Sequence, residues 1–241
     1  MNYLAVSLPV CTMSRMRKAL PWIVLSALLL GGSVGFAPSW LGGDRLDVAH
    51  VVSIKAAREY QDRSLLEAAW ALPVARLYRQ DIDFQKNASF CGPTSVVNVM
   101  RSLQQTADQA SILQDTGVFT VMGFLPGGLT LDQLAELARQ QLGRRVSVLR
   151  ELDLAGFREQ LRHANELPRR YVVNFTRGPL FGTGGGHHSP IAGYLADQDL
   201  VLVLDVNEQY RPWLAKSERL YDAMNTLDPA SQKKRGLLLV E

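Results

Sequence analysis

The chain has 241 residues, of which 47% are hydrophobic and 20% charged, and its formal net charge is +3. This composition is typical of a globular protein with one main core, and it excludes disordered and fibrous proteins. Because the net charge is small and no basic stripe is interleaved with aromatic residues, the sequence predicts no nucleic acid partner.

The N-terminal segment differs from the rest of the chain. Basic residues at positions 15–18 precede an apolar run over residues 19–30, and the next charged residue is Asp44. A basic stretch followed by an apolar run is the pattern of an export signal. We therefore expect the protein to be exported.

The same pattern divides the chain into an N-terminal signal peptide or membrane anchor, residues 1–43, and a folded domain, residues 44–241. Small residues around Ala37 suit signal cleavage, whereas the uncharged stretch near residues 19–40 approaches the ~20 residues that span a bilayer. Both alternatives predict a periplasmic or extracytoplasmic domain, and the second adds a membrane anchor.

The first half of the domain has mainly helical patterns. Apolar spacing, prolines and glycines predict an extended stretch at 51–54, a helix at 65–70 that ends before Pro73, a helix from Cys91 to Leu103, a short helix from 106 closed by Gly117, a loop at 123–128, and a helix from the capping box at Thr130 to Gly143.

Cys91 opens one of these helices, and it is the only cysteine besides Cys11. Exported proteins usually keep their cysteines in pairs, yet Cys91 has no partner in the folded domain. A thiol in the first turn of a helix feels the positive end of the helix dipole, which favours the thiolate. The structural alternative is a small buried apolar side chain. The placement favours a nucleophile.

The second half of the domain changes to strand patterns. The sequence predicts strands at 145–149, 171–175, 191–195, 200–204 and 236–240, helices from Asp153 and over 218–225, and a loop around Arg211–Trp213. A helical half followed by an antiparallel sheet half indicates an α+β fold.

His187 and Asp205 flank the predicted hairpin formed by strands 191–195 and 200–204. Antiparallel pairing brings the start of one strand and the end of the next to the same end of the sheet, so these side chains can meet. His187 would take the thiol proton of Cys91, and Asp205 would orient the imidazole. A surface histidine and a turn-forming aspartate are the structural alternatives.

Gln85 lies shortly before Cys91. Its side-chain amide and the backbone N–H of Cys91 are suited to form an oxyanion hole. A surface glutamine is the alternative. The remaining histidines, His50 and His163, lack acidic or thiol partners at metal-ligand spacing, so the sequence predicts no metal site and no built-in cofactor.

Several segments resemble the phytochelatin synthase family, and they occur in the family's order. They are the segment from Gln85 to Cys91-Gly92, Gly128-Leu129-Thr130-Leu131-Asp132, Gly186-His187-His188-Ser189-Pro190, Leu204-Asp205-Val206, and the stretch from Ala223 to Gly236. The resemblance implies a papain-like fold for residues 44–241, which would be a catalytic domain. It also implies an enzyme that forms a γ-glutamylcysteinyl thioester from glutathione, releases glycine, and passes the acyl group to water or to another glutathione.

Carried over by position, Cys91 is the nucleophile, His187 the base, Asp205 the orienting residue and Gln85 the oxyanion donor. The resemblance further assigns Asp228 and Arg235 to substrate binding. An aspartate and an arginine can separately recognise the ammonium and the carboxylate at the γ-glutamyl end of glutathione.

His188 follows the expected base where the family more often has an aliphatic or aromatic residue, which makes it the alternative base. Because successive strand residues point to opposite faces, we expect only one of the two imidazoles to reach Cys91.

The leading interpretation is therefore a thiol acyltransferase or hydrolase acting on glutathione and γ-glutamyl peptides. The sequence stops soon after Arg235, without the cysteine-rich extension of the plant enzymes, and this favours hydrolysis over peptide synthesis. The resemblance implies that a heavy-metal ion enters as a complex with substrate thiolates; a homodimer is compatible with it. The alternatives are an exported papain-like peptidase and a noncatalytic module that binds metal or thiols through Cys91.

Overall fold

The computed structural model describes residues 51–79 and 82–241, so the expected signal peptide or anchor at 1–43 lies outside the described residues. No helix in the described part of the chain has the length and apolar character needed to cross a bilayer. The elements are η3 (Ile54–Ala56), α1 (Arg63–Trp70), α2 (Ala75–Tyr78), α3 (Cys91–Ser102), α4 (Leu131–Leu142), β1 (Val146–Leu149), α5 (Leu154–His163), β2 (Arg170–Thr176), α6 (Gly178–Phe181), β3 (Gly186–Leu195), η4 (Ala196–Gln198), β4 (Leu200–Leu204), β5 (Pro212–Lys216), α7 (Ser217–Met224), β6 (Leu227–Asp228), β7 (Lys233–Lys234) and β8 (Leu237–Val240).

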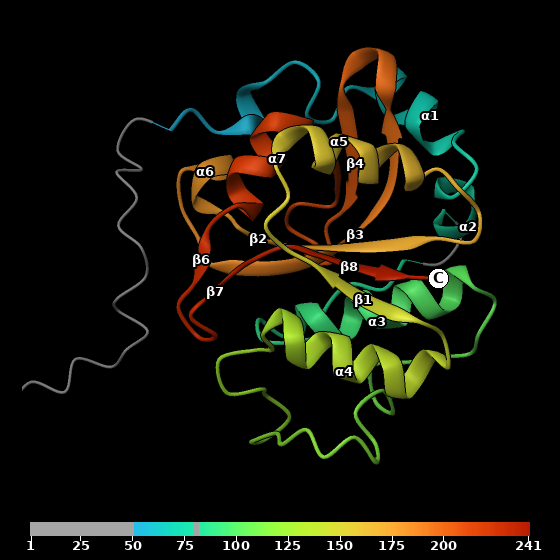
Figure 1. The fold of residues 1–241 in the computed structure, drawn as a ribbon, viewed down its shortest axis with the longest axis vertical. Helices are drawn as coiled ribbons and strands as arrows, with labels where there is room; N and C mark the ends of the chain where they lie inside the picture. The colour runs from blue at the N-terminus through green and yellow to red at the C-terminus, as the bar shows by residue number, and fades with distance from the viewer. Residues whose placement is uncertain (1–50, 80–81) are drawn as a thin grey trace, which may run out of the picture. The chain divides into compact units, whose positions relative to one another are not determined.

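The centre of the fold is a six-stranded antiparallel sheet with the strand order β1-β8-β2-β3-β4-β5. Helices α3 and α4 lie on one side of it, and α5 and α7 lie on the other (Figure 1). Central strands covered on both faces are expected to be apolar along their whole length. This is why β4, with the sequence LVLVL, is buried at every position.

Two apolar clusters attach the helices to the sheet. Val172 packs with α3 and α4, whereas the neighbouring Val173 packs with α5 and α7. This is the alternation that a strand imposes on successive side chains. The expected α+β arrangement is confirmed: a helical part begins at Cys91, and an antiparallel sheet carries His187 and leads into Asp205.

The two helices next to the site begin and end as their sequences predict. The Thr130 side chain accepts a hydrogen bond from the backbone N–H of Gln133, and the Gln133 side chain accepts one from the backbone N–H of Thr130. The capping box is confirmed. Gly143, with φ 60°, ends α4 in the left-handed conformation that glycine adopts readily. On α3, the Ser95 hydroxyl donates to the carbonyl oxygens of Cys91 and His188, which ties the helix to β3.

Two expected elements differ from the structure. The extended stretch expected at 51–54 forms no strand and ends at Ser53, because the Ser53 side chain accepts from the Lys55 N–H and starts the 3-10 turn η3. The expected helix between 106 and Gly117 is a series of turns. There the Asp108 carboxylate accepts from the N–H groups of residues 110 and 111, a local bond that competes with helix formation.

Two boundaries also differ. Strand β3 begins at Gly186, before the expected start at 191, because residues 186–191 pair with β2. The expected loop around Arg211–Trp213 contains the start of β5, which pairs with β4. A proline is compatible with that position because β5 is an edge strand and Pro212 is its first residue.

Candidate active site

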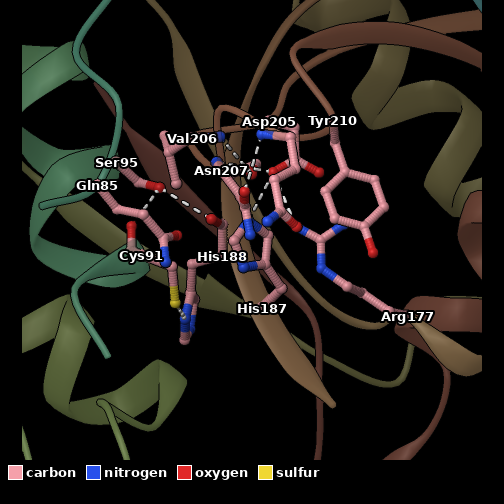
Figure 2. A network of polar contacts seen from close by, with 12 residues as sticks. Gln85, Cys91, Ser95, Arg177, His187, His188, Asp205, Val206, Asn207 and Tyr210 are labelled. Carbon is pink, nitrogen blue, oxygen red and sulfur yellow. Dashed lines mark hydrogen bonds and ion pairs between the residues drawn. The ribbon is translucent and has the colours of Figure 1, made fainter. Parts of the chain in front are cut away.

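Cys91 is the first residue of α3 and is almost fully buried. Its Sγ lies 3.8 Å from Nδ1 of His188 (Figure 2). The first N–H groups of an α-helix have no intrahelical acceptor, so the thiol sits beside unpaired donors and the positive end of the helix. The thiol therefore has the surroundings of a nucleophile rather than of an inert core cysteine.

His187 and Asp205 are brought together by the β3–β4 hairpin. Nε2 of His187 lies 3.0 Å from Oδ1 of Asp205, and both side chains are buried. The edge of the Phe175 ring faces the imidazole, with the two ring centroids 5.5 Å apart. Since Asp205 lies on the Nε2 side of the ring, Nδ1 of His187 is the nitrogen left for proton exchange with the thiol.

Asp205 has three further donors that the sequence did not indicate. The guanidinium of Arg177 donates to Oδ1 at 2.8 Å, and the backbone N–H of Asn207 donates to Oδ1 at 3.0 Å (Figure 2). The indole N–H of Trp213 donates to Oδ2 at 3.0 Å. Arg177 also lies over the Tyr210 ring, 3.8 Å from its centroid. This cluster fixes the carboxylate that faces His187.

These neighbours shift the ionisation of the thiol and the imidazole in opposite directions. Burial alone raises the pKa of Cys91, but the imidazoles of His187 and then His188 outweigh it and hold that pKa well below its ordinary value. Burial alone lowers the pKa of His187, but the Asp205 carboxylate and then the Cys91 sulfur outweigh it and raise that pKa. The site therefore favours a thiolate–imidazolium pair at neutral pH.

The Asp205 carboxyl stays ionised in this setting. Burial raises its pKa, but His187 and Arg177 together outweigh burial and hold that pKa well below its ordinary range. A buried carboxylate with two cationic partners and two further N–H donors is the arrangement in which a buried charge is tolerated.

One imidazole, that of the alternative base His188, lies at contact distance from the Cys91 sulfur, yet both imidazoles act on the thiol. His188 contacts the sulfur, while His187 acts on the thiol as the larger of the two electrostatic influences. The rings do differ in surroundings, since His187 packs against Phe175 and the backbone of His188 is tied to α3. Charge interactions act over about 4–6 Å and do not require a shared face, so both rings influence one thiol.

Gln85 lies close to this cluster, and its backbone N–H donates to the carbonyl of Val206, the residue after Asp205. One N–H of its side-chain amide donates to the carbonyl of Asn87 at 2.9 Å. An amide has two such N–H groups, so one remains for a ligand. Its oxygen Oε1 is buried and has no hydrogen-bond partner among the described residues.

Asp228 and Arg235 come together at the β6–β7 hairpin. Their carboxylate and guanidinium are 3.7 Å apart, and both side chains are buried. Arg235 donates to Oδ1 of Asn174, whose amide donates to the carbonyl of His187. The guanidinium also lies against Gly186, where an added Cβ would come within 2.8 Å of it. Arg235 therefore connects the pair to β3, the strand that carries His187, through Asn174 and through Gly186.

Within residues 51–79 and 82–241, no group of three His, Cys, Asp or Glu side chains is arranged to hold a metal ion. The described side chains supply acid–base and nucleophilic groups: a thiol, an imidazole with a carboxylate, a side-chain amide, and a buried charged pair. Together these groups fit acyl transfer through a thioester.

Comparison with known proteins identifies the family. The family model described as phytochelatin synthase matches residues 53–237, which is most of the chain. The chain belongs to the phytochelatin synthase family. The matched range contains all six residues that the sequence predicted for the site, together with the three donors to Asp205 found in the structure.

Individual relatives agree with this membership. The chain is 38% identical over 117 residues to glutathione gamma-glutamylcysteinyltransferase 3 of Lotus japonicus and 27% identical over 117 residues to the Schizosaccharomyces pombe glutathione gamma-glutamylcysteinyltransferase. Each match covers 47% of this chain, but only 24% and 28% of the respective relative. The chain thus matches about a quarter of the length of these phytochelatin synthase relatives.

Among solved structures, a C39-like peptidase from Bacillus anthracis is 14% identical, covers 67% of this chain and 94% of its own, and gives a TM-score of 0.48. The peptidase domain of Streptococcus ComA, a bifunctional ABC transporter, is 16% identical, covers 65% and 93%, and gives a TM-score of 0.44.

Proposed function

We propose that this phytochelatin synthase family member cleaves the cysteinyl-glycine bond of glutathione through a γ-glutamylcysteinyl thioester on Cys91. The observation that carries the proposal is the buried Cys91, His187 and Asp205 cluster, in which the pKa of the thiol is lowered and that of the imidazole is raised. The names of the relatives, glutathione gamma-glutamylcysteinyltransferases, support glutathione as the acyl donor.

In the first step the Cys91 thiolate attacks the carbonyl carbon between the cysteine and glycine residues of glutathione. The carbonyl oxygen becomes an oxyanion, and in this proposal the Cys91 backbone N–H and the remaining amide N–H of Gln85 stabilise it. The His187 imidazolium then gives its proton to the glycine nitrogen. The C–N bond breaks, glycine leaves, and a thioester remains on the enzyme.

In the second step the neutral His187 takes a proton from the acceptor as the acceptor attacks the thioester. With water as the acceptor, the product is γ-glutamylcysteine. With the α-amino group of a second glutathione as the acceptor, the product is a lengthened γ-glutamyl peptide. In both cases the Cys91 sulfur leaves as a thiolate and the ion pair is restored. Asp205 stabilises the imidazolium throughout and keeps its proton-bearing Nε2 oriented.

Asp228 and Arg235 are suited to hold the γ-glutamyl end of the donor. The ammonium of that group fits the Asp228 carboxylate, and the α-carboxylate fits the Arg235 guanidinium. Because Asn174 links Arg235 to the backbone of His187, donor binding is fixed relative to the base. A heavy-metal ion enters this scheme only as a complex with the thiols of the substrate.

The test is glycine release and mass spectrometry. The purified protein with glutathione should release glycine, and brief exposure should add a γ-glutamylcysteinyl group to Cys91. The Cys91→Ala variant should do neither. A protein that releases no glycine from glutathione but cleaves a generic peptide digest would replace the proposal with the peptidase alternative.

A further inference from the structure

The β6–β7 hairpin is a small two-stranded sheet outside the central one; it contains Asp228, and Arg235 directly follows its second strand. Residues 227–228 pair with 233–234, and the backbone N–H of Arg235 donates to the Thr226 carbonyl at 2.9 Å. Its turn is held from within, where the Asp228 carboxylate accepts from the N–H of Ala230 and the hydroxyl of Ser231. A hairpin with so few pairs needs outside contacts to fix its position on the domain.

Asp132, the second residue of α4, supplies such a contact. Its Oδ2 lies 2.8 Å from Nζ of Lys233, and its Oδ1 lies 2.8 Å from a guanidinium nitrogen of Arg150. Arg150 also donates through Nε to the carbonyl of Lys234 at 2.7 Å. We call Asp132, Arg150 and Lys233 the Asp132 clasp. It joins α4 of the helical part to the hairpin.

The clasp acts on the peptide unit that carries Arg235. The Lys234 carbonyl held by Arg150 belongs to the peptide bond between Lys234 and Arg235. On the other side of Arg235, Gly236 lies so close to β1 that an added Cβ would come within 2.2 Å of the Leu149 carbonyl oxygen. The backbone around Arg235 is therefore held by the clasp before it, by its own N–H bond to the Thr226 carbonyl, and by the close approach to Leu149 and the Asn174 N–H bond to the Gly236 carbonyl after it.

We propose that the Asp132 clasp is a positioning device that sets the Asp228–Arg235 pair for the γ-glutamyl end of the donor, and that Asp132 is a positioning residue for substrate affinity. The inference rests on the proposed function, because it assigns the hairpin pair to the donor. Asp132 itself contacts neither Cys91 nor His187 in the described contacts, so its effect is on binding and not on the acyl transfer chemistry.

The exposure of the clasp separates this role from a general role in stability. The Asp132 side chain is 40% exposed and that of Lys233 is 59% exposed. Ion pairs with this exposure contribute little to the free energy of unfolding, since water and salt screen them. Their loss can still displace a small hairpin whose pairing is too short to fix it.

The experiment is steady-state glycine release from glutathione with the full-length protein and its Asp132→Asn variant. We expect KM for glutathione to rise by about two- to fivefold, a change of the size that exposed ion pairs produce, and kcat to stay within about twofold. The rate of Cys91 alkylation by iodoacetamide without glutathione should not change. The Asp132→Glu variant, which keeps the carboxylate, should restore part of the affinity.

Glu136→Gln is the matched control, because Glu136 lies on the same helix and pairs with Arg139 on the exposed surface. It should leave KM unchanged. Lys233→Met should also raise KM. The KM increase in the double variant should be smaller than the product of the two single increases, because both substitutions remove the same Asp132–Lys233 ion pair. This second route tests the clasp where Asp132→Asn alone folds poorly.

Equal KM values for the wild type, Asp132→Asn and Lys233→Met would overturn the clasp and leave the proposed function intact. An unchanged KM with a lower kcat and a slower alkylation of Cys91 in Asp132→Asn would also overturn it, because the effect would then lie on the thiol. A wild-type protein that releases no glycine would instead overturn the proposed function itself.

Discussion

Two clusters of the described residues, each with one carboxylate between two cationic groups, differ in burial. Asp205, with His187 and Arg177, is fully buried; Asp132, with Arg150 and Lys233, is partly exposed. In the buried cluster each charge depends on its partners, because none of them has water as an alternative. In the exposed cluster water replaces a lost partner at little cost. We therefore expect the Asp205 cluster to control the ionisation of the thiol and imidazole, and the Asp132 cluster to control the position of the β6–β7 hairpin.

The largest effect should come from the buried cluster. His187→Ala removes the proposed acid and base, and we expect kcat for glycine release to fall by about 10²–10⁴-fold. In His188→Ala we expect kcat for glycine release to fall less, because His188 contacts the thiol without a carboxylate partner in the described contacts. Steady-state kinetics of both variants measures the difference. Inactivation by His188→Ala alone would assign the base to His188.

The next effect is on stability. Arg177→Met removes one buried partner of Asp205 without replacing its charge, so we expect the free energy of unfolding to fall by about 3–5 kcal/mol. Urea unfolding followed by circular dichroism measures it. Arg79→Met is the control, since the Arg79–Glu67 pair is exposed, and it should barely change the midpoint. Equal midpoints for the two variants would mean that the buried pair is not needed.

The pH dependence of Cys91 alkylation by iodoacetamide tests the ionisation of the same cluster. Because the pKa of the thiol is lowered and that of His187 is raised, the ion pair exists between the two pKa values. The rate should therefore persist through neutral and mildly acidic pH and fall only below the lowered thiol pKa. In His187→Ala the fall should move upward, toward the ordinary thiol pKa of about 8.5. Identical pH profiles for the wild type and His187→Ala would show that His187 is not the partner of the thiolate.

The smallest effect on stability should come from the exposed cluster. Asp132→Asn should change the free energy of unfolding by less than about 1 kcal/mol, because Asp132 and Lys233 are exposed and Arg150, 18% exposed, keeps its bond to the Lys234 carbonyl. Thermal unfolding of this variant beside Arg177→Met gives the comparison directly. A loss in Asp132→Asn as large as that in Arg177→Met would show that the clasp supports the whole fold, and the contrast between the clusters would fail.

Much of the fold was predictable where local signals agree with the tertiary structure. The capping box at Thr130, the glycine end at Gly143 and the apolar strand 200–204 each carry a local physical cause, and the structure has them. The helix expected from 106 failed because the Asp108 side chain competes for the backbone N–H groups. The strand at 212–216 was missed because its proline reads as a loop signal unless the edge position is known.

By itself, the sequence determined the order of the chemistry: an unpaired thiol at a helix start, then a histidine, then an aspartate after an apolar strand. Those signals can be read from the sequence, because each is either local or depends on the pairing of two strands that follow one another in the chain. Only the tertiary structure decided that Arg177 and Trp213 hold Asp205, that both imidazoles influence Cys91, and that Asp132 is joined to the β6–β7 hairpin. Apart from the Trp213 bond, which spans eight residues, these contacts join segments far apart in the chain, and no local pattern specifies which distant side chains a fold brings together.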